Sequence, residues 1–320
     1  MHIFSDIGDY AAYLASSGSK GTAAAVGKFD GLHRGHRKLL ETVLKSARER
    51  GLKTAVFSFD KSIASFFSGE EQKVLTTLKE RRELLRDLSF DALIEFPVNE
   101  KTVAIEPEDF IKDILCGGLK IRELVAGPDM SYGYMGRGDF ELLKKMGKKY
   151  CYEAIAVPKL LYEGEEISST RVRTSVLKGD MELAEALLGR PYSIEGYVRH
   201  GRALGKSMLS MPTVNLEIED NKILPPLGVY FSRAIVGSEV YNGITNIGRK
   251  PTIAESGRVN AETYLYDFDG DLYGAFIRVG LLHWHREEMR FPDLDSLKRQ
   301  MHEDMLSGRG FFEGVSGHGG

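Results

Sequence analysis

One stretch near the amino terminus constrains the fold of this chain more than any other. Residues 23–26 are small or β-branched and suit a buried strand, and residues 27–36 break on glycine before an amphipathic helix begins. The apolar side chains of one helix face follow at Leu39, Leu40, Val43, Leu44 and Ala47. A strand, a glycine turn and a helix N-terminus together form an anion site, because free amide hydrogens and the helix dipole converge there.

Two histidines stand in this turn, three residues apart. At the start of a helix, His33 and His36 can face the same side, where they could donate hydrogen bonds to phosphate oxygens. The alternative is a surface turn that carries two solvated histidines, because short motifs often match by chance. The pattern alone leaves both interpretations open.

Strand-like and helix-like segments alternate from residue 22 to about residue 188, which is typical of a parallel α/β sheet. Further strands are predicted at 54–59, 92–96, 124–127 and 153–157. Ligands of such sheets gather at the carboxyl ends of the strands. The first strand ends at the histidine motif and the fourth ends at residues 127–129, so both ends are candidate parts of a site.

From about residue 192 the pattern changes to short β-like runs that are broken by glycine and proline, which suggests a small antiparallel barrel. A final helix over about 295–306 would pack outside the barrel. Gly189 and Pro191 are helix-stop residues. We therefore predict two domains, residues 1–187 and 188–313, followed by a disordered glycine-rich tail at 314–320.

Composition excludes several classes of protein. The formal net charge of −3 gives no general case for a nucleic acid or an anionic membrane. No uncharged apolar run reaches the roughly 18 residues of a spanning helix. The N-terminus lacks the pattern of a signal peptide, and two cysteines are too few for a disulfide framework. We expect a cytoplasmic protein without nucleic-acid or membrane partners, as a monomer or a weak homo-oligomer.

The segment Gly27-Lys28-Phe29-Asp30-Gly31-Leu32-His33-Arg34-Gly35-His36 resembles the H-x-G-H signature of nucleotidyltransferases, in the longer form of prokaryotic FAD synthetases. The segment Ile167-Ser168-Ser169-Thr170-Arg171-Val172-Arg173 is similar to a second motif of that family, and residues 127–133 are similar to a third. The resemblance implies that His33, His36 and Arg173 are catalytic and that Asp129 binds flavin. It also implies that ATP phosphates contact Gly27, Lys28, Phe29, Asp30, Gly35, Ser168, Ser169 and Thr170.

The second half resembles the riboflavin kinase domain that this family carries. The matching segments are His200-Gly201, Gly205-Lys206, Pro212-Thr213-Val214-Asn215, residues 246–252, Glu262, Asp267-Phe268, residues 271–274 and residues 286–291. The resemblance implies that Glu262 is the catalytic base and that Arg286 binds flavin. It assigns Mg²⁺ to Thr213 and Asn215, and ATP to Gly205, Lys206 and Pro212. Without it, a proline turn and an exposed strand glutamate would explain these residues.

The resemblance therefore implies a bifunctional enzyme with an α/β nucleotidyltransferase domain, a Rossmann-like parallel sheet, followed by an antiparallel β-barrel kinase domain with a C-terminal helix. Riboflavin would be phosphorylated to FMN with ATP and Mg²⁺, and FMN would then be adenylylated by a second ATP to FAD and pyrophosphate. One alternative is a nucleotidyltransferase for another phosphorylated acceptor, with a regulatory flavin-binding β domain. The other is a non-enzymatic flavin- or nucleotide-binding module. Glu262, Thr213 and Asn215 argue against the first, and the His33, His36 and Arg173 set argues against the second.

Overall fold

A computed structural model describes residues 1–199, 213–249 and 259–316 of the 320-residue chain. The chain divides into two compact units, Met1–Ser169 and Thr170–Gly320, and each is described by itself. Among the described residues, no helix combines the length and the apolar character needed to cross a membrane.

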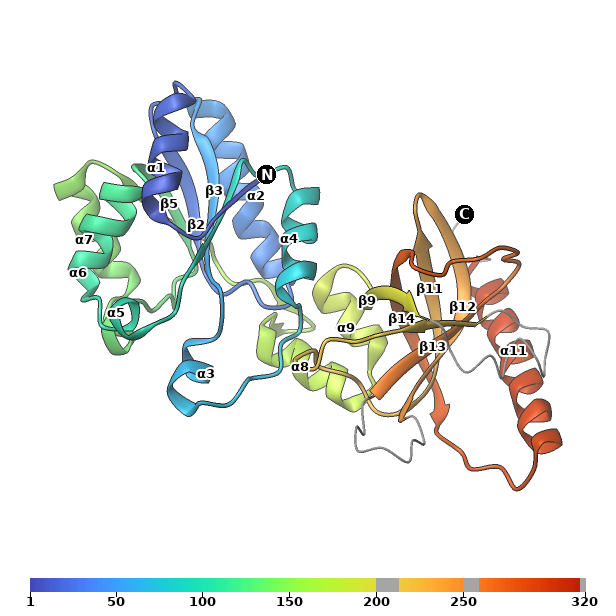
Figure 1. Cartoon of the computed structure of the whole chain (residues 1–320). Helices are drawn as coiled ribbons and strands as arrows, with labels where there is room; N and C mark the ends of the chain where they lie inside the picture. The colour runs from blue at the N-terminus through green and yellow to red at the C-terminus, as the bar shows by residue number, and fades with distance from the viewer. Residues whose placement is uncertain (200–212, 250–258, 317–320) are drawn as a thin grey trace. The chain divides into compact units, whose positions relative to one another are not determined.

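The first unit is built on a six-stranded sheet in the order β1-β4-β3-β2-β5-β6 (Figure 1). All neighbouring strands run parallel, which confirms the predicted sheet. The strands are β1 (His2–Phe4), β2 (Thr22–Val26), β3 (Lys53–Phe59), β4 (Ala92–Phe96), β5 (Ile121–Ala126) and β6 (Glu153–Ala156). Strand β1 was not predicted, because three residues are too few to show a periodic pattern.

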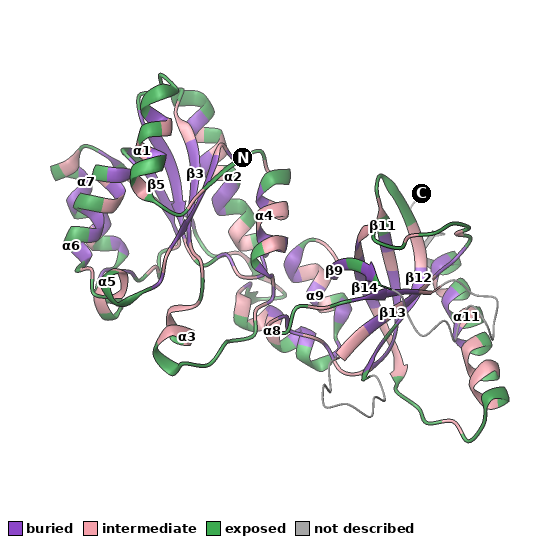
Figure 2. Ribbon diagram, viewed as in Figure 1, coloured by how far each residue is buried: buried purple, intermediate pink, exposed green. Residues whose placement is uncertain are grey.

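Helices cover both faces of this sheet, and Figure 2 shows the strands between them as largely buried. Apolar side chains of α2 and α4 pack on one face, and those of α1, η1 and α7 pack on the other. The helices are α1 (Ile7–Ser16), α2 (Arg34–Arg50), α3 (Ile63–Ser68), α4 (Leu78–Asp87), α5 (Glu100–Val103), α6 (Pro107–Asp109), the π-helix η1 (Phe110–Gly118), the 3₁₀ turn η2 (Tyr134–Gly136) and α7 (Phe140–Tyr150). A small hairpin follows, with β7 (Leu161–Tyr162) and β8 (Glu165–Glu166).

The order of the strands places a topological switch point between β2 and β5. From β2 the chain continues to β3 and β4 on one side of the sheet, and it then crosses to β5 and β6 on the other side. Connections that leave in opposite directions open a crevice at the carboxyl ends of the two strands, where open α/β sheets bind ligands. The histidine loop follows β2 and residues 127–133 follow β5, so both predicted segments lie at this crevice.

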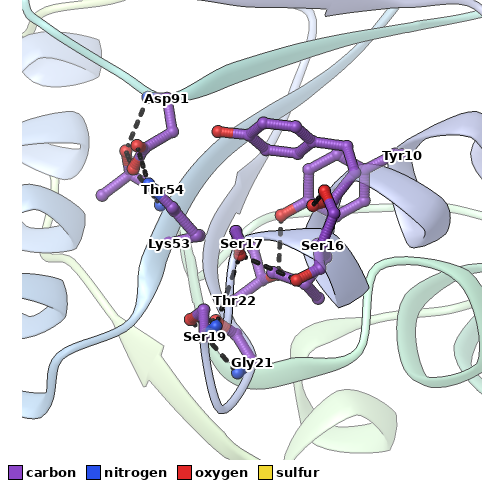
Figure 3. A network of polar contacts seen from close by, with 11 residues as sticks. Tyr10, Ser16, Ser17, Ser19, Gly21, Thr22, Lys53, Thr54 and Asp91 are labelled. Atoms are coloured by element: carbon purple, nitrogen blue, oxygen red, sulfur yellow. Dashed lines mark hydrogen bonds and ion pairs between the residues drawn. The ribbon is translucent and has the colours of Figure 1, made fainter.

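Hydrogen bonds link the elements at the opposite end of the sheet, where the strands begin (Figure 3). The hydroxyls of Tyr10 and Thr22 lie 2.7 Å apart, and burial raises the pKa of Tyr10 to about 12. The Asp91 carboxylate accepts from the backbone N–H and the hydroxyl of Thr54, each at 2.9 Å, and pairs with Lys53 at 2.8 Å. These polar groups satisfy one another, so this edge stabilises the sheet and the carboxyl edge remains for ligands.

The second unit contains a closed barrel of strands in the order β10-β13-β12-β11-β14-β9. All of its pairs are antiparallel, which confirms the predicted barrel. Its elements are α8 (Ser169–Lys178, beginning at the last residue of the first unit), α9 (Met181–Leu188), β9 (Tyr192–Arg199), β10 (Thr213–Leu216), β11 (Gly228–Val236), β12 (Glu239–Arg249), β13 (Val259–Leu265), β14 (Phe276–Glu287) and α11 (Leu294–Ser316).

The final helix is longer than its predicted extent of about 295–306. Glycines in this stretch indicate a helix end, yet Gly308 serves close packing, because a Cβ there would collide with the hydroxyl of Tyr266. That hydroxyl donates to the Met305 carbonyl at 2.7 Å. Residues 314–316, predicted as part of a disordered tail, belong to the helix, and residues 317–320 lie outside the described residues.

Candidate functional sites

The loop between β2 and α2 has an unusual backbone. Phe29, Gly31 and Leu32 all have positive φ angles, of 51°, 81° and 42°. Such angles are uncommon for residues with a side chain and persist where surrounding contacts hold them. The side chains of Phe29 and Leu32 are buried in the core between α2 and the sheet, so the loop is anchored from below.

The loop delivers two stacked imidazoles to the start of α2. His33 is the N-cap, and its Nδ1 accepts a hydrogen bond from the His36 backbone N–H at 3.3 Å. Because Nδ1 accepts, the ring proton lies on Nε2. The two ring centroids are 3.7 Å apart with planes inclined by 17°, so the prediction that both histidines face the same side is confirmed. The alternative of two solvated histidines is wrong for His33, which is 6% exposed.

His36 is held in its neutral form. Burial, the larger cause, and the neighbouring His33 lower the pKa of His36 well below its ordinary value. Its Nδ1 is buried and has no hydrogen-bond partner among the described residues. Buried polar atoms are normally satisfied, so an unpartnered ring nitrogen at a helix N-terminus is consistent with a ligand-binding position.

Gly35 has a steric role in this arrangement. A Cβ at this position would lie 3.1 Å from His33 Nδ1 and 3.2 Å from its Cε1, so the His33 ring would have to shift by a few tenths of an ångström to admit it. The glycine of the H-x-G-H motif therefore makes room for the His33 ring over the first turn of α2. Direct contact between Gly35 and phosphate stays a prediction.

Asp30 holds the loop in place. Its Oδ1 accepts from the backbone N–H groups of Leu75 at 2.8 Å and Thr76 at 3.1 Å. The hydroxyl of Ser169 donates to the Asp30 carbonyl at 2.8 Å. An ionised carboxylate only accepts hydrogen bonds, so it cannot donate to a phosphate. The structure thus gives Asp30 and Ser169 a role in shaping the loop, beside the predicted phosphate contact.

The remaining residues of the second motif are divided between the units. Ser168 and Ser169 end the first unit, whereas Thr170 and Arg173 lie on α8 in the second unit. The approach of Arg173 to the histidines therefore stays a prediction. So do the phosphate contacts of Gly27, Lys28 and Phe29.

Asp129, the predicted flavin-binding residue, follows β5 at the switch point. Its Oδ2 pairs with Lys159 Nζ at 3.0 Å, and the same ammonium group binds Glu166 at 2.8 Å. The carboxylate is exposed and remains accessible to a ligand, and its contact with flavin stays a prediction.

In the second unit, one row of residues crosses the outside of the barrel. Strand register pairs Asn215 with Glu262, Glu262 with Asn246, Asn246 with Val229, and Val229 with Arg286. Cross-strand neighbours of this kind share a face of the sheet with their Cβ atoms about 5 Å apart. The predicted residues Asn215 and Glu262 are thereby brought together.

Glu262 is tied to the predicted metal residues. Thr213 donates its hydroxyl to Glu262 Oε1 at 2.8 Å, and Asn215 Oδ1 accepts from Asn260 Nδ2 at 3.3 Å. Among the described residues, no group of three or more His, Cys, Asp or Glu side chains could by itself hold a metal. Mg²⁺ is commonly held by few protein oxygens together with substrate phosphates, so the hydroxyl, amide and carboxylate oxygens fit it.

Asn246 is a candidate that sequence reasoning missed. It lies in the quoted segment 246–252, but its position beside Glu262 depends on the pairing of β12 with β13. That register is a long-range property, so no local pattern reveals it. The flanking of one carboxylate by two amide side chains emerges only from the folded barrel.

Arg286, predicted to bind flavin, forms a two-pronged ion pair with Asp304 of α11. Nε lies 2.8 Å from Oδ1 and Nη2 lies 2.6 Å from Oδ2, and Asp304 is 4% exposed. The pair anchors α11 against an apolar cluster made of Val229, Phe231, Ile244, Tyr266, Leu282 and Phe312. The guanidinium therefore positions the helix, and direct contact with flavin stays a prediction. Gly205, Lys206 and Pro212 lie outside the described residues.

Comparison with known proteins links both units to flavin metabolism. A family model for FAD synthetase matches residues 15–171, and a model for riboflavin kinase matches residues 188–312. The bifunctional riboflavin kinase/FMN adenylyltransferase of Escherichia coli K12 is 35% identical over 301 residues, 93% of this chain and 95% of that protein. The protein of the same description from Bacillus subtilis is 34% identical over 297 residues, 91% of this chain and 92% of its own length. A crystal structure described as a macrolide-efflux protein from Streptococcus pneumoniae is 28% identical, covers 91% of this chain and 95% of its own, and superposes with a TM-score of 0.79.

Proposed function

Because this chain belongs to the family of bifunctional riboflavin kinases and FMN adenylyltransferases, we propose that its two sites divide the two reactions between them. The barrel phosphorylates riboflavin to FMN, and the parallel-sheet unit adenylylates FMN to FAD. The observation that carries this division is that each family match falls on one architecture with its own site. Membership of this enzyme family excludes both the non-enzymatic module and the regulatory β domain as descriptions of the whole chain.

Adenylyl transfer at the histidine loop requires positioning more than proton transfer. The nucleophile is a phosphate oxygen of FMN, which is already an anion, and it attacks the α-phosphorus of ATP with loss of pyrophosphate. The Nε2 proton of His33, a ring proton of His36 and the positive end of the α2 dipole would stabilise the charge on the phosphates. Arg173 would supply a positive charge from α8.

Phosphorylation of riboflavin at the barrel requires a proton acceptor. Thr213 engages Glu262 Oε1, which orients the carboxylate and leaves its other oxygen for the ribityl hydroxyl. The hydroxyl oxygen then attacks the γ-phosphorus of ATP, and ADP leaves. When bound, Mg²⁺ would neutralise charge on the ATP phosphates, and Thr213 and Asn215 would hold it.

The decisive experiment for this function is direct. Purified protein is incubated with riboflavin, ATP and Mg²⁺, and the flavins are separated by chromatography. FAD is the expected product. FMN alone would contradict the assignment of the first unit, and unchanged riboflavin would contradict both.

We also propose that the protein works in the cytoplasm as a monomer or weak homo-oligomer without nucleic acid, which light scattering and nucleic-acid titration would test.

The compact second unit begins at Thr170, whereas the predicted boundary lies between residues 187 and 188. Helix α9 buries Met181, Leu187 and Leu188, and its Glu182 lies 2.5 Å from His283 of β14. We expect a fragment that begins at residue 170 to make FMN as the full chain does. A fragment that begins at Leu188 lacks the buried apolar side chains of α8 and α9, which are Val172, Val176, Met181, Ala184 and Leu187. Met181 and Leu187 alone correspond to about 3–6 kcal/mol, so this fragment should be active but less stable by at least that amount. Thermal unfolding of both fragments measures this difference, and equal stability would contradict it.

The neutral His36 predicts a dependence of stability on pH. The folded-state pKa lies below the ordinary value, so the stabilisation is complete above about pH 6.5. It is lost as the pH falls toward the folded pKa, by up to about 1.4 kcal/mol per pH unit, because only the unfolded chain takes up the proton. Urea unfolding between about pH 5 and 8 should show a shallower slope for His36→Gln than for the parent. Equal slopes would show that His36 is not held neutral.

A further inference from the structure

We propose that Arg81 is a positioning residue for adenylyl transfer, because it clamps the loop on which His33 and His36 stand. The inference rests on the proposed assignment of that reaction to the histidine loop. Arg81 lies on α4, is 8% exposed and belongs to none of the motifs that the sequence indicates.

The guanidinium of Arg81 joins the carboxyl ends of neighbouring strands. It donates to the Lys28 carbonyl at 3.2 Å, in the loop after β2. It also donates to the hydroxyl of Ser58 at 2.9 Å and to the carbonyl of Phe59 at 2.8 Å, where β3 ends. Glu95 of β4 lies 3.6 Å away and supplies the opposite charge. Nη1 reaches Lys28 and Ser58 while Nη2 reaches Phe59, a span of two nitrogens that the single nitrogen of a lysine does not provide.

The segment 75–81 also holds the loop on the other side of Phe29, the residue whose φ angle is positive. Phe29, with its φ of 51°, stands between Lys28 and Asp30. Arg81 fixes the Lys28 carbonyl both directly and through Ser58, whose hydroxyl accepts from Arg81 and donates to that carbonyl at 3.2 Å. The backbone just before α4 fixes Asp30 through the amides of Leu75 and Thr76. Strained backbone persists only where contacts over-determine it. Loss of the Arg81 contact should therefore let the loop relax and move the imidazoles.

The burial of Arg81 indicates a role beyond stabilising the fold. Removing a guanidinium from water costs free energy, and burial lowers the pKa of this one. Its neighbour Arg82 provides a matched comparison. Arg82 pairs with the same carboxylate, with Nε and Nη2 at 3.0 and 2.5 Å from Glu95, but among the described residues it makes no contact with the loop. The two arginines thus share Glu95 as a partner, but only Arg81 donates to the Lys28 carbonyl of the loop.

The test compares Arg81→Met, Arg81→Lys and Arg82→Met in the full chain, with FMN and ATP supplied. A displacement of the reacting groups by about 1 Å can cost about 10²-fold, so kcat of Arg81→Met should fall by about that factor. The KM for ATP should change much less. Arg81→Lys should recover part of the lost kcat. Arg82→Met costs stability because Glu95 is buried, but it leaves Arg81 beside that carboxylate, so its kcat should stay within about twofold of the parent. Riboflavin phosphorylation in the second unit is the internal reference and should not change.

The proposal is overturned if Arg81→Met retains its kcat, or if Arg82→Met loses as much at a similar unfolding temperature. Should Arg81→Met not fold, Arg81→Lys decides: a normal kcat in the folded variant overturns the proposal. His36→Ala is measured beside them to separate the proposal from the site assignment. Loss of activity in His36→Ala with normal activity in Arg81→Met refutes only the role of Arg81, whereas normal activity in His36→Ala refutes the site itself.

Discussion

Glu262→Gln is expected to reduce FMN formation by about 10²–10⁴-fold, the usual cost of removing a positioned acid–base group. The amide keeps the shape of the side chain and an oxygen that can accept the Thr213 hydroxyl, but it cannot take up the proton of the ribityl hydroxyl. Riboflavin binding should largely persist, as measured by quenching of flavin fluorescence. With FMN supplied directly, the first unit should still make FAD at close to its normal rate.

Glu239→Gln is a suitable control for this variant, since it removes an exposed carboxylate at the beginning of β12. It should phosphorylate riboflavin as the parent does. If Glu262→Gln matches the parent too, Glu262 is an ordinary strand residue and the base must be sought elsewhere on the same barrel face. That search would begin at the neighbours of Asn246, which pairs with Glu262 across the strands.

His36→Ala should lower FAD formation by about 10²–10³-fold, as when one donor to a developing negative charge is removed. The substitution deletes the buried, unpartnered Nδ1 and also one member of the stacked imidazole pair. FMN formation from riboflavin should survive, because it takes place in the other unit. Chromatography of the flavins after incubation with riboflavin and ATP would therefore show FMN accumulating without FAD.

Arg37→Ala provides the matched control on the same turn of α2. Arg37 pairs with Glu41 on the surface at 3.0 Å, and exposed pairs of this kind contribute little. Its FAD formation should be normal. Normal FAD formation by His36→Ala would instead show that the histidine motif is not the adenylylation site.

Local sequence determined the elements that carry the chemistry. The small residues of β2, the glycines after it and the apolar face of α2 predict strand, turn and helix, because each depends on neighbours within a few residues. The i, i+3 spacing predicts that His33 and His36 face the same side, and in the structure the cap formed by His33 Nδ1 and the His36 N–H brings the two rings together. The change to glycine-broken β runs likewise predicts the barrel without its register.

Long-range packing sets which of these elements face one another. The row from Asn215 through Glu262 to Asn246 arises from strand register, and the pairing of Arg286 with Asp304 joins a strand to a distant helix. Arg81 reaches the histidine loop from α4, 53 positions along the chain from its acceptor. Such contacts join segments far apart in sequence, and their geometry is set by packing of the whole unit. A local pattern therefore predicts which residues are present at a site, and the fold determines which of them meet.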